Sequence, residues 1–573
     1  MNLFFKFVIV LCLSLWAHYA YAQPPGKSVA QTATTKLGSI TGRVLADGQA
    51  VMNASVTVTR VNATTASRYV PTNDNGDFEA KDLDAGIYRV RASAPGYVAT
   101  LNDSAEDTYY RVGDSILLTM TKGGVISGKV TGANDEPVIA VRVRALMIRD
   151  SEGKTAIGGD ATNDRLTDDR GIYRIFGLRP GTYVVYAGGR GSSGYGVNAF
   201  DNDAPTYAPS STRDTAAEIS LGSAEEKTVD IHYRGEAGHS ISGNATAPAN
   251  PNSPWISINL TRVVDGAADV KFSTHQNSTP KGFEFQGIAD GEYLIWAQYS
   301  RTGGDAVVSE PRRVTVKGAD VTGIDLTTKP LATVAGEFVL ERSKIESCKG
   351  KPPAFDETVV AIQRKPKTPE KDWPELPLFS SAQATPDTSG RFVLRNLWSG
   401  AYDLEVRFFS RYWYLRSIKY PSSSAASRSA ETNGASGNHL SLKAGDGFNG
   451  IKITLAEGAA SLAGQIKLPK DQLPKATSFI YLVPAEKDAA DDALRFFTAE
   501  IEADGSFALD NLPPGRYWSI VKTPSDKDPK SIKTLRIADA VEMRAKLRTE
   551  AEAARHELEL HDCQKLADYQ LFP

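Results

Sequence analysis

A unit of seventeen residues occurs five times in the chain, and this repeat constrains the fold more than any other feature. Counted from the turn residue, each copy has an aromatic residue at +2, an apolar residue at +4, Leu or Ile at +7, Gly at +10 and Tyr at +12. The copies are DNGDFEAKDLDAGIYRV (74–90), DRGIYRIFGLRPGTYVV (169–185), TPKGFEFQGIADGEYLI (279–295), TSGRFVLRNLWSGAYDL (388–404) and ADGSFALDNLPPGRYWS (503–519). The repeated tyrosines are Tyr88, Tyr183, Tyr293, Tyr402 and Tyr517. Their spacing of 95 to 115 residues indicates a tandem array of domains, because solenoid repeats are about 20–50 residues long.

Each part of the unit has a structural purpose. Asp-x-Gly or its equivalent favours a tight hairpin, because Gly adopts positive φ without strain. On the strand that follows, the residues at +2 and +4 point to the same face and are predicted to enter the core. The Leu-x-x-Gly stretch bends the chain, and the Tyr returns it to a strand. This pattern predicts a tyrosine corner, in which the ring is buried and the hydroxyl bonds to nearby backbone.

A similar strand opens each module, and another similar strand closes it. The openers have the pattern apolar-small-Gly-x-apolar, which is typical of a half-buried strand whose Gly marks a bulge or a close backbone approach. They are ITGRV (40–44), ISGKV (126–130), ISGNA (241–245), VAGEF (334–338) and LAGQI (462–466). The closers are DSILLTM (114–120), TVDIHYR (228–234), TGIDLTT (322–328), NGIKITL (449–455) and ADYQLFP (567–573). We therefore predict five β-sandwiches, over 37–122, 123–235, 236–328, 329–457 and 458–573, with long loop insertions at 341–385 and 422–437 in the fourth.

One helix is predicted, over 539–555 in the fifth module. Met543, Leu547, Ala551 and Ala554 form an apolar stripe at helical spacing. The helix lies between the last repeat unit and the last closing strand, so it is an insertion in the module.

The N-terminus has the pattern of an export signal. Lys6 precedes the apolar run FVIVLCLSLW (7–16), and Ala20-Tyr21-Ala22 offers a cleavage site before Gln23. We predict a signal peptide over 1–22 and an unstructured leader over 23–36. The apolar run is too short to span a bilayer comfortably, and no transmembrane segment is predicted in the mature chain.

After removal of the predicted signal peptide, the mature chain contains two cysteines, Cys348 and Cys563. In an oxidising compartment a disulfide between them is favoured over two free thiols, but the sequence does not show whether their Cα atoms approach within bonding range. A C-x-x-C motif is absent from the sequence, so a structural purpose is predicted for these cysteines.

With openers, repeat units and closers assembled, the chain resembles tandem carboxypeptidase regulatory-like domains of the bacterial secreted type. These are transthyretin-like β-sandwiches, close to collagen-adhesin B-type repeats and starch-binding-like domains. The resemblance rests on the G-x-[FY]-x-[AVL]-x-x-L-x-x-G-x-Y units and covers roughly 37–573. It implies an all-β fold. Such modules do no chemistry in metallocarboxypeptidases and serve as stalks or spacers in surface proteins, while related sandwiches bind glycans.

The sequence offers little support for catalysis, a metal or a cofactor. The histidines are scattered, without H-E-x-x-H or H-x-H. The acidic turns at 73–77 and 167–171 faintly resemble calcium loops but lack the bidentate Glu, and hairpin geometry already explains them. Gly189-x-Gly191-x-x-Gly194 matches a dinucleotide fingerprint, yet a stretch rich in Asn, Asp and Pro follows where a helix is needed. We predict no enzyme, no metal and no cofactor.

An aromatic segment at 408–414 (FFSRYWY) is the remaining candidate for binding. If it forms a strand, Phe409 and Trp413 lie on one face, and Phe408, Tyr412 and Tyr414 on the other. Exposed rings here would stack on sugars. Docking of the segment under the 341–385 insertion is the account we favour. Phe409, Tyr412, Trp413 and Tyr414 are the candidate stacking residues.

The balance of 65 basic and 68 acidic residues argues against a nucleic-acid partner, which normally requires a basic stripe. The leading hypothesis is therefore an exported, non-enzymatic scaffold, spacer or adhesion protein in the periplasm, on the outer surface or outside the cell. Its expected partners are proteins or polysaccharides of the cell envelope. The alternative is carbohydrate binding through the aromatics of the fourth module.

Overall fold

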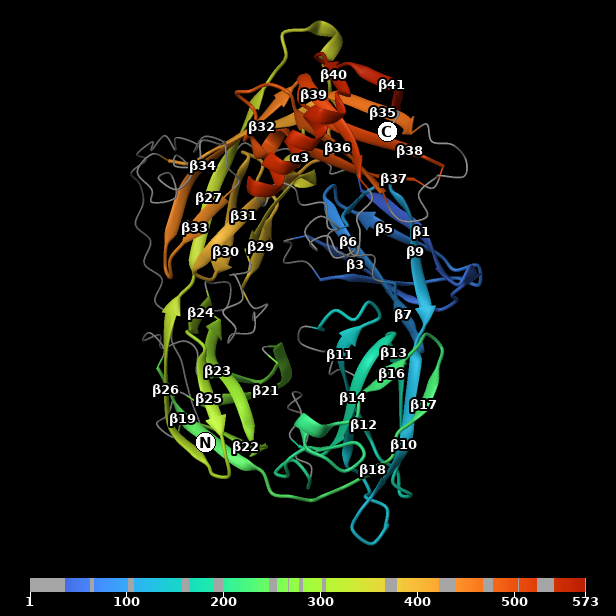
Figure 1. Ribbon diagram of the computed structural model, residues 1–573, viewed down its shortest axis with the longest axis vertical. Coiled ribbons are helices and arrows are strands. Elements are labelled where there is room, and N and C mark those ends of the chain that lie inside the picture. Colours follow the sequence, from blue (N-terminus) through green and yellow to red (C-terminus); the bar gives the residue numbers. More distant parts are fainter. Residues whose placement is uncertain are drawn as a thin grey trace, which may run out of the picture. The chain divides into compact units, whose positions relative to one another are not determined.

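The computed structural model confirms an all-β chain with repeated sheets, and the residues it describes contain one α-helix (Figure 1). It describes residues 37–571, apart from 62–65, 101–107, 157–163, 190–198, 247–254, 266, 278–281, 301–305, 366–378, 422–438, 467–477, 503 and 523–540. The predicted signal peptide and leader lie outside the described residues, as do the predicted loop insertion at 422–437, Gly191 and Gly194. We name the five groups of strands modules 1 to 5, after the predicted ranges.

Modules 1 and 2 each contain two sheets. In module 1 the sheets are β2-β1-β9-β7, with β5 on β1, and β4-β3-β6-β8. Its strands are β1 Gly38–Ala46, β2 Gln49–Ala50, β3 Ser55–Arg60, β4 Arg68–Pro71, β5 Asp77–Leu83, β6 Ile87–Ser93, β7 Tyr97–Ala99, β8 Tyr110–Arg111 and β9 Ser115–Lys122. Module 2 consists of β10 Gly124–Thr131, β11 Arg142–Asp150, β12 Asp164–Leu166, β13 Ile172–Leu178, β14 Gly181–Ala187, β15 Thr206–Tyr207, the short 3-10 helix η2 Arg213–Thr215, β16 Ile219–Leu221, β17 Glu226–Thr228 and β18 Ile231–His232.

Module 3 differs, because β24 pairs with both β23 and β26 and joins its two layers into one eight-stranded sheet. Its strands are β19 His239–Thr246, β20 Trp255–Val264, β21 Ala267–Asn277, β22 Phe283–Ile288, β23 Gly291–Ser300, β24 Ala306–Ser309, β25 Arg312–Val316 and β26 Val321–Pro330.

Modules 4 and 5 return to two sheets each. In module 4 these are β30-β27-β34-β32 and β29-β28-β31-β33. Its elements are β27 Ala332–Glu341, η3 Glu346–Cys348, η4 Phe355–Glu357, β28 Val359–Arg364, β29 Ser381–Ala384, β30 Arg391–Leu397, β31 Gly400–Arg407, β32 Trp413–Lys419, β33 His439–Leu442 and β34 Gly447–Glu457. Module 5 has β35 Ala460–Ile466, β36 Ser478–Pro484, η6 Ala493–Arg495, β37 Phe497–Ile501, β38 Ser506–Leu512, β39 Gly515–Lys522, α3 Val541–Ala554, β40 Glu557–Leu560 and β41 Lys565–Leu571.

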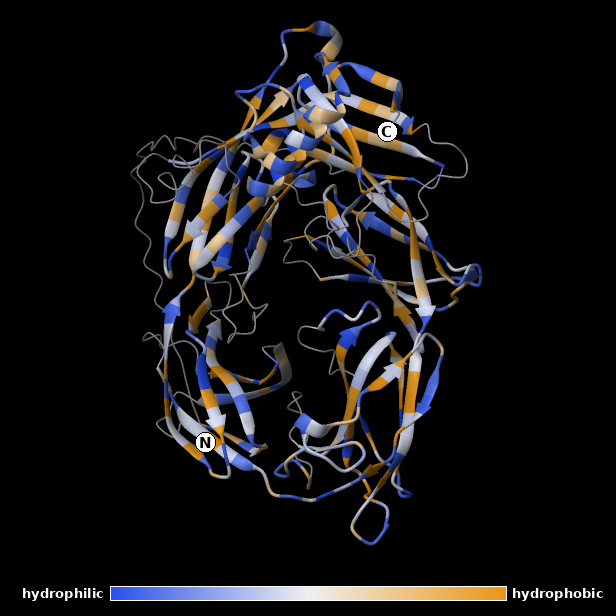
Figure 2. Ribbon diagram, in the orientation of Figure 1, coloured by the Kyte–Doolittle hydropathy of each residue, from blue (hydrophilic) through white to orange (hydrophobic). Residues whose placement is uncertain are grey.

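The opening strand of every module lies between the strand of the repeat unit and the closing strand. It pairs antiparallel with the former and parallel with the latter, for example β1 with β5 and β9, and β35 with β38 and β41. Buried and more exposed residues alternate along these strands, as in β1 and β27, and Figure 2 shows hydrophobic and hydrophilic residues mixed along the strands. The alternation follows from the two-residue period of a strand that is buried on one face.

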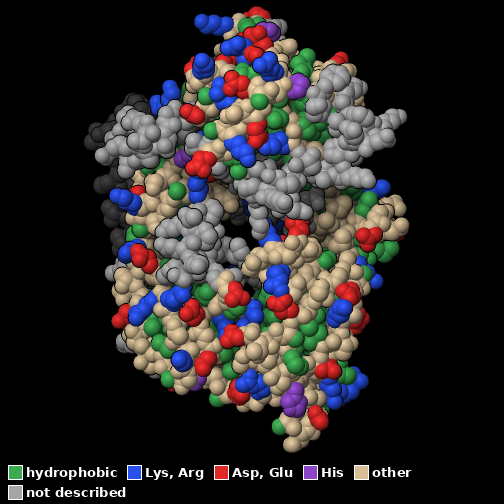
Figure 3. All heavy atoms as spheres, viewed as in Figure 1, with side chains coloured by type: hydrophobic (Ala, Val, Ile, Leu, Met, Phe, Trp, Pro, Cys, Tyr) green, Lys and Arg blue, Asp and Glu red, His purple; other side chains and the backbone are tan. Residues whose placement is uncertain are grey.

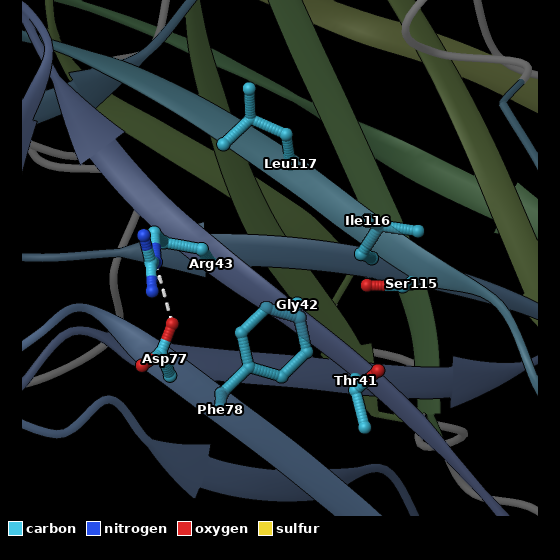
Figure 4. A pocket seen from close by; sticks show the side chains of 8 residues that line it. All are labelled: Thr41, Gly42, Arg43, Asp77, Phe78, Ser115, Ile116 and Leu117. Atoms are coloured by element: carbon cyan, nitrogen blue, oxygen red, sulfur yellow. Dashed lines mark hydrogen bonds and ion pairs between the residues drawn. The ribbon is translucent and has the colours of Figure 1, made fainter.

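The opener glycine is required by a close backbone approach. A Cβ at any of the five opener glycines would lie within 2.6 Å of a carbonyl oxygen of the closing strand. The glycine also faces the aromatic residue of the repeat unit across the antiparallel pair, as Gly42 faces Phe78. Figure 4 shows this pair beside Ile116, with the ion pair of Arg43 and Asp77 next to it. The ring therefore fills the space that a side chain would otherwise occupy.

In modules 1, 2 and 4 the turn that precedes the aromatic residue is held by a side chain. In module 4, Asp387 Oδ1 accepts hydrogen bonds from the backbone amides of Ser389 at 2.9 Å and Arg391 at 3.0 Å. The hydrogen bond from the Ser389 hydroxyl, together with these backbone contacts, lowers the pKa of Asp387 to about 2. Asn73 and Asp168 bond their turns in the same way. These side chains therefore stabilise the hairpin turns.

All five repeated tyrosines are buried, and their hydroxyls make the same contact. Each donates to the backbone carbonyl four residues earlier, at 2.7 or 2.8 Å. The acceptors are the carbonyls of Asp84, Arg179, Ala289, Trp398 and Pro513. This is the geometry of a tyrosine corner.

Alkaline pH should unfold module 4 as Tyr402 ionises. Burial raises the pKa of this phenol to about 12, compared with about 10 in an unfolded chain. The folded state thus holds the proton more tightly, and the resulting stability is complete below about pH 10 and lost as the pH rises towards about 12. Phenolate absorbance and circular dichroism, followed together, should change in one transition that Tyr402→Phe shifts. Ionisation of Tyr402 near pH 10 in a folded protein would contradict this account.

The helix α3 confirms the predicted insertion, but its buried face is rotated from the predicted one. Leu547 and Ala551 are buried, whereas Ala554 is exposed and Arg544 is buried in its place. The guanidinium of Arg544 lies over the ring of Phe496 at 5.8 Å. Because α3 covers β36 and β39, strand β36 is buried on both faces.

Apolar contacts cross two of the joints between modules. Leu146, Tyr186 and Tyr207 of module 2 belong to the same cluster as the core of module 3. Trp296 of module 3 shares another cluster with Trp398 of module 4. These rings therefore serve contacts between modules.

Candidate functional site

The aromatic segment (residues 408–414) lies where β31 ends and β32 begins. Residues 408–412 form a connection between the two strands, so the prediction of a strand with alternating faces is wrong. Tyr412 has a φ of 65°, which turns the chain before β32. Its carbonyl accepts hydrogen bonds from the backbone amides of Gly458 at 2.7 Å and Ala459 at 2.9 Å. The segment is therefore tied to the first residues of module 5.

Each of three rings in the segment has a cation of the same chain over its face. The guanidinium of Arg342 lies 5.3 Å from the ring of Trp413, and that of Arg111 lies 4.6 Å from the ring of Phe409. The ammonium of Lys565 lies 5.3 Å from the ring of Tyr412. These distances are within the range of cation–π attraction, about 6 Å.

Trp413 is fully buried in the core of module 4, with an exposed fraction of 0%. It therefore has no free face for a ligand, and the expectation that it stacks on sugars is wrong. Phe409 is 38% exposed, and Tyr412 and Tyr414 are partly buried. Burial raises the pKa of the Tyr414 hydroxyl. The segment thus forms contacts within the chain, as the favoured account of docking expects.

The loop 342–350, at the start of the predicted insertion, begins with Arg342, which lies over Trp413, and is held by the carboxylate of Glu457. Oε1 accepts from the backbone amide of Gly350 at 2.7 Å and from Arg342 Nη1 at 3.3 Å, while Oε2 accepts from the backbone amide of Ser343 at 3.1 Å. The side chain of Glu457 is completely buried. Buried charges are tolerated when they are paired and hydrogen-bonded in this way.

The same loop is joined covalently to module 5. Cys348, in η3, forms a disulfide with Cys563, and their Cα atoms are 5.4 Å apart. The backbone amide of Cys563 donates to the carbonyl of Gly458 at 2.9 Å. The joint between modules 4 and 5 therefore combines a covalent bond with the backbone hydrogen bonds from Gly458 and Ala459 to the carbonyl of Tyr412.

A second polar cluster lies on the outer face of β31 and β33. The imidazole of His439 hydrogen-bonds through Nδ1 to Asp403, and Lys365 Nζ lies 3.2 Å from Asp403 Oδ1 and 3.4 Å from His439 Nε2. The ammonium of Lys365 thus lies against Nε2 of His439, which is the ring nitrogen that would have to accept a proton if His439 activated a hydroxyl or thiol. Within the described residues, no group of three His, Cys, Asp or Glu side chains is placed to hold a metal.

The sequence did not identify Glu457, Arg342, Arg111 or Asp403 as members of these clusters. Each is a charged residue without a motif around it, and its neighbours in space are distant in the sequence. Only the position of Glu457, at a predicted joint, carried any signal.

Charged side chains of both signs are interspersed on the face shown in Figure 3.

The described part of the chain contains no helix that is both long and apolar enough to cross a membrane. The only α-helix there, α3, has 14 residues.

The fold defines an all-β protein built from repeated sandwich modules. Residues 39–106 match the family model of the carboxypeptidase regulatory-like domain, which confirms the resemblance for module 1. No curated protein matches the chain at a significant level.

Solved structures of the TIE protein and of bacterial pilins align with parts of the chain. The TIE protein of Bacillus anthracis is 16% identical, over 51% of this chain and 51% of its own, with a TM-score of 0.14; the chain thus spans about half the length of that protein. GBS52, the minor pilin of Streptococcus agalactiae, is 14% identical over 38% of this chain and 99% of its own, with a TM-score of 0.19. BcpA, the major pilin subunit of Bacillus cereus, is 12% identical over 51% of this chain and 99% of its own, with a TM-score of 0.14. Likeness at this level carries no argument about function.

Proposed function

We propose that this protein is an exported, non-enzymatic scaffold or spacer of the cell envelope that presents its surfaces to other envelope components. The proposal rests on the aromatic segment (residues 408–414), whose rings contact other residues of the same chain. Trp413, Phe409 and Tyr412 each have a cation of the same chain over one ring face, so these aromatic residues take part in contacts inside the protein. The repeated Gly and Tyr residues are likewise used by the fold.

The joint between modules 4 and 5 supports a scaffold rather than a flexible string of domains. The disulfide of Cys348 and Cys563 holds the two modules together, and Glu457 fixes the loop of module 4 that contains Cys348. A fixed joint keeps binding surfaces at a fixed separation, which a flexible linker does not. The N-terminal export pattern supports a location outside the cytoplasm.

Cross-linking in intact cells tests the proposal. A full-length, C-terminally tagged chain, treated with a membrane-impermeant cross-linker in the cells that produce it, should be recovered joined to envelope proteins and beginning at Gln23. An uncleaved chain in the cytoplasm would contradict export. An exported chain that yields no cross-linked protein but is retained by a polysaccharide array would favour carbohydrate binding instead.

A further inference from the structure

The outer face of the sheet β29-β28-β31-β33 in module 4 contains an apolar residue that its own module does not explain. Alternation along β28 places Val360 and Ile362 in the core of the module, so Val359 and Ala361 point away from that core. Yet the exposed fraction of Val359 is 0%. Its apolar neighbours are Val61, Ile87 and Tyr109 of module 1, with Ala361 packed against them.

Polar contacts surround this apolar cluster. The hydroxyl of Tyr109 donates to Gln383 Oε1 at 2.6 Å, and Arg407 lies over the Tyr109 ring at 5.7 Å. From module 1, Arg111 Nη1 lies 3.7 Å from Glu357 Oε2. The guanidinium of Arg111 is also the cation over Phe409. An apolar centre with hydrogen bonds and charges at its rim is the usual anatomy of a protein–protein interface.

We propose that this face of module 4 is a docking surface, that module 1 of the same chain occupies it, and that the contact opens and closes in solution. The two sides are distant in sequence, since 274 residues separate Tyr109 from Gln383. The contact can open because few side chains make it among the described residues, and because Arg111 and Glu357 remain partly exposed to solvent. It is independent of what the protein binds outside the cell, and so goes beyond the proposed function.

A buried thiol on this surface reports whether the contact is closed. Val359→Cys places a free thiol under module 1, and we expect thiol reagents to modify it slowly in the otherwise unchanged full-length chain. Adding Tyr109→Ala and Arg111→Glu should speed the modification about tenfold, because both the apolar centre and the charged rim are lost. Tyr69→Ala is the matched control, since Tyr69 lies in the same module and is 69% exposed.

Charge reversal supplies a second, independent measurement. Arg111→Glu alone should raise the radius of gyration measured by small-angle X-ray scattering, and Arg111→Glu with Glu357→Arg should bring it back towards the original value. If the thiol reacts equally fast in the parent and opened variants, or the double reversal restores nothing, the proposal is wrong. Protection of the thiol that increases with protein concentration would also overturn it, because module 1 of a second copy would then be the occupant.

Discussion

Replacing both Cys348 and Cys563 by alanine is expected to lower the free energy of unfolding of modules 4 and 5 by about 5 kcal/mol. The disulfide joins residues 215 apart in the sequence, and in the chain-entropy account a cross-link stabilises by restricting the unfolded chain. The longer the closed loop, the larger this restriction becomes. The effect is large compared with the total stability of a domain, about 5–15 kcal/mol.

The measurement is denaturant unfolding of the full-length chain, with and without a reducing agent. Reduction of the unchanged protein should reproduce the loss seen in the alanine variant, and should leave the alanine variant itself unaffected. Peptide mass spectrometry without reduction should find the two cysteines in one cross-linked species. Free thiols at both positions, or a stability that reduction does not change, would refute the expectation.

Gly243→Ala is expected to destabilise module 3 by about 3 kcal/mol. Gly243 is the opener glycine of β19, and a Cβ there would collide with the carbonyl oxygen of Ile324 in β26. That oxygen belongs to the backbone of a paired strand, so it cannot move without disturbing the sheet. The added methyl group therefore forces the two strands apart, at a cost that flexible side chains cannot absorb.

Gly447→Ala is the matched control for this substitution. Gly447 also lies in a strand, β34, but a Cβ there would meet only Asn449 Nδ2 at 3.8 Å, and the change should be within about 1 kcal/mol of neutral. Urea unfolding of the full-length chain, with hydrogen exchange read separately over β19 and β34, distinguishes the two modules. Equal effects of the two substitutions would show that the backbone approach is not the reason for the glycine.

The repeat made most of the fold predictable from the sequence. Each opener, repeat unit and closer forms strands in the structure, and even the short closer at 567–573 corresponds to β41. The reason is physical: the Gly, aromatic and Tyr positions act through local turns and the neighbouring strand, so their pattern appears directly in the sequence. The helix was predictable from the helical spacing of its apolar residues. Its buried face was not, because Arg544 stacks on Phe496 and an apolar stripe does not reveal a buried arginine.

The candidate site was less predictable, because it depends on contacts between distant residues. A positive φ at Tyr412 ends the alternation that the aromatic segment would have as a strand, and few non-glycine residues adopt this conformation. Nothing near Trp413 in the sequence indicates that Arg342 covers it, or that Arg111 reaches Phe409. The covered rings thus looked like binding residues until their neighbours in space were known.

The pairing of opening and closing strands has a mechanical consequence. In every module these two strands are adjacent and parallel, as β27 and β34 are. Tension that pulls the start of the opener away from the end of the closer therefore acts along the strands and shears them past each other. The evenly spaced hydrogen bonds of a parallel pair then carry the load together instead of breaking one after another. Each module is consequently built to resist stretching along the direction in which the chain enters and leaves it.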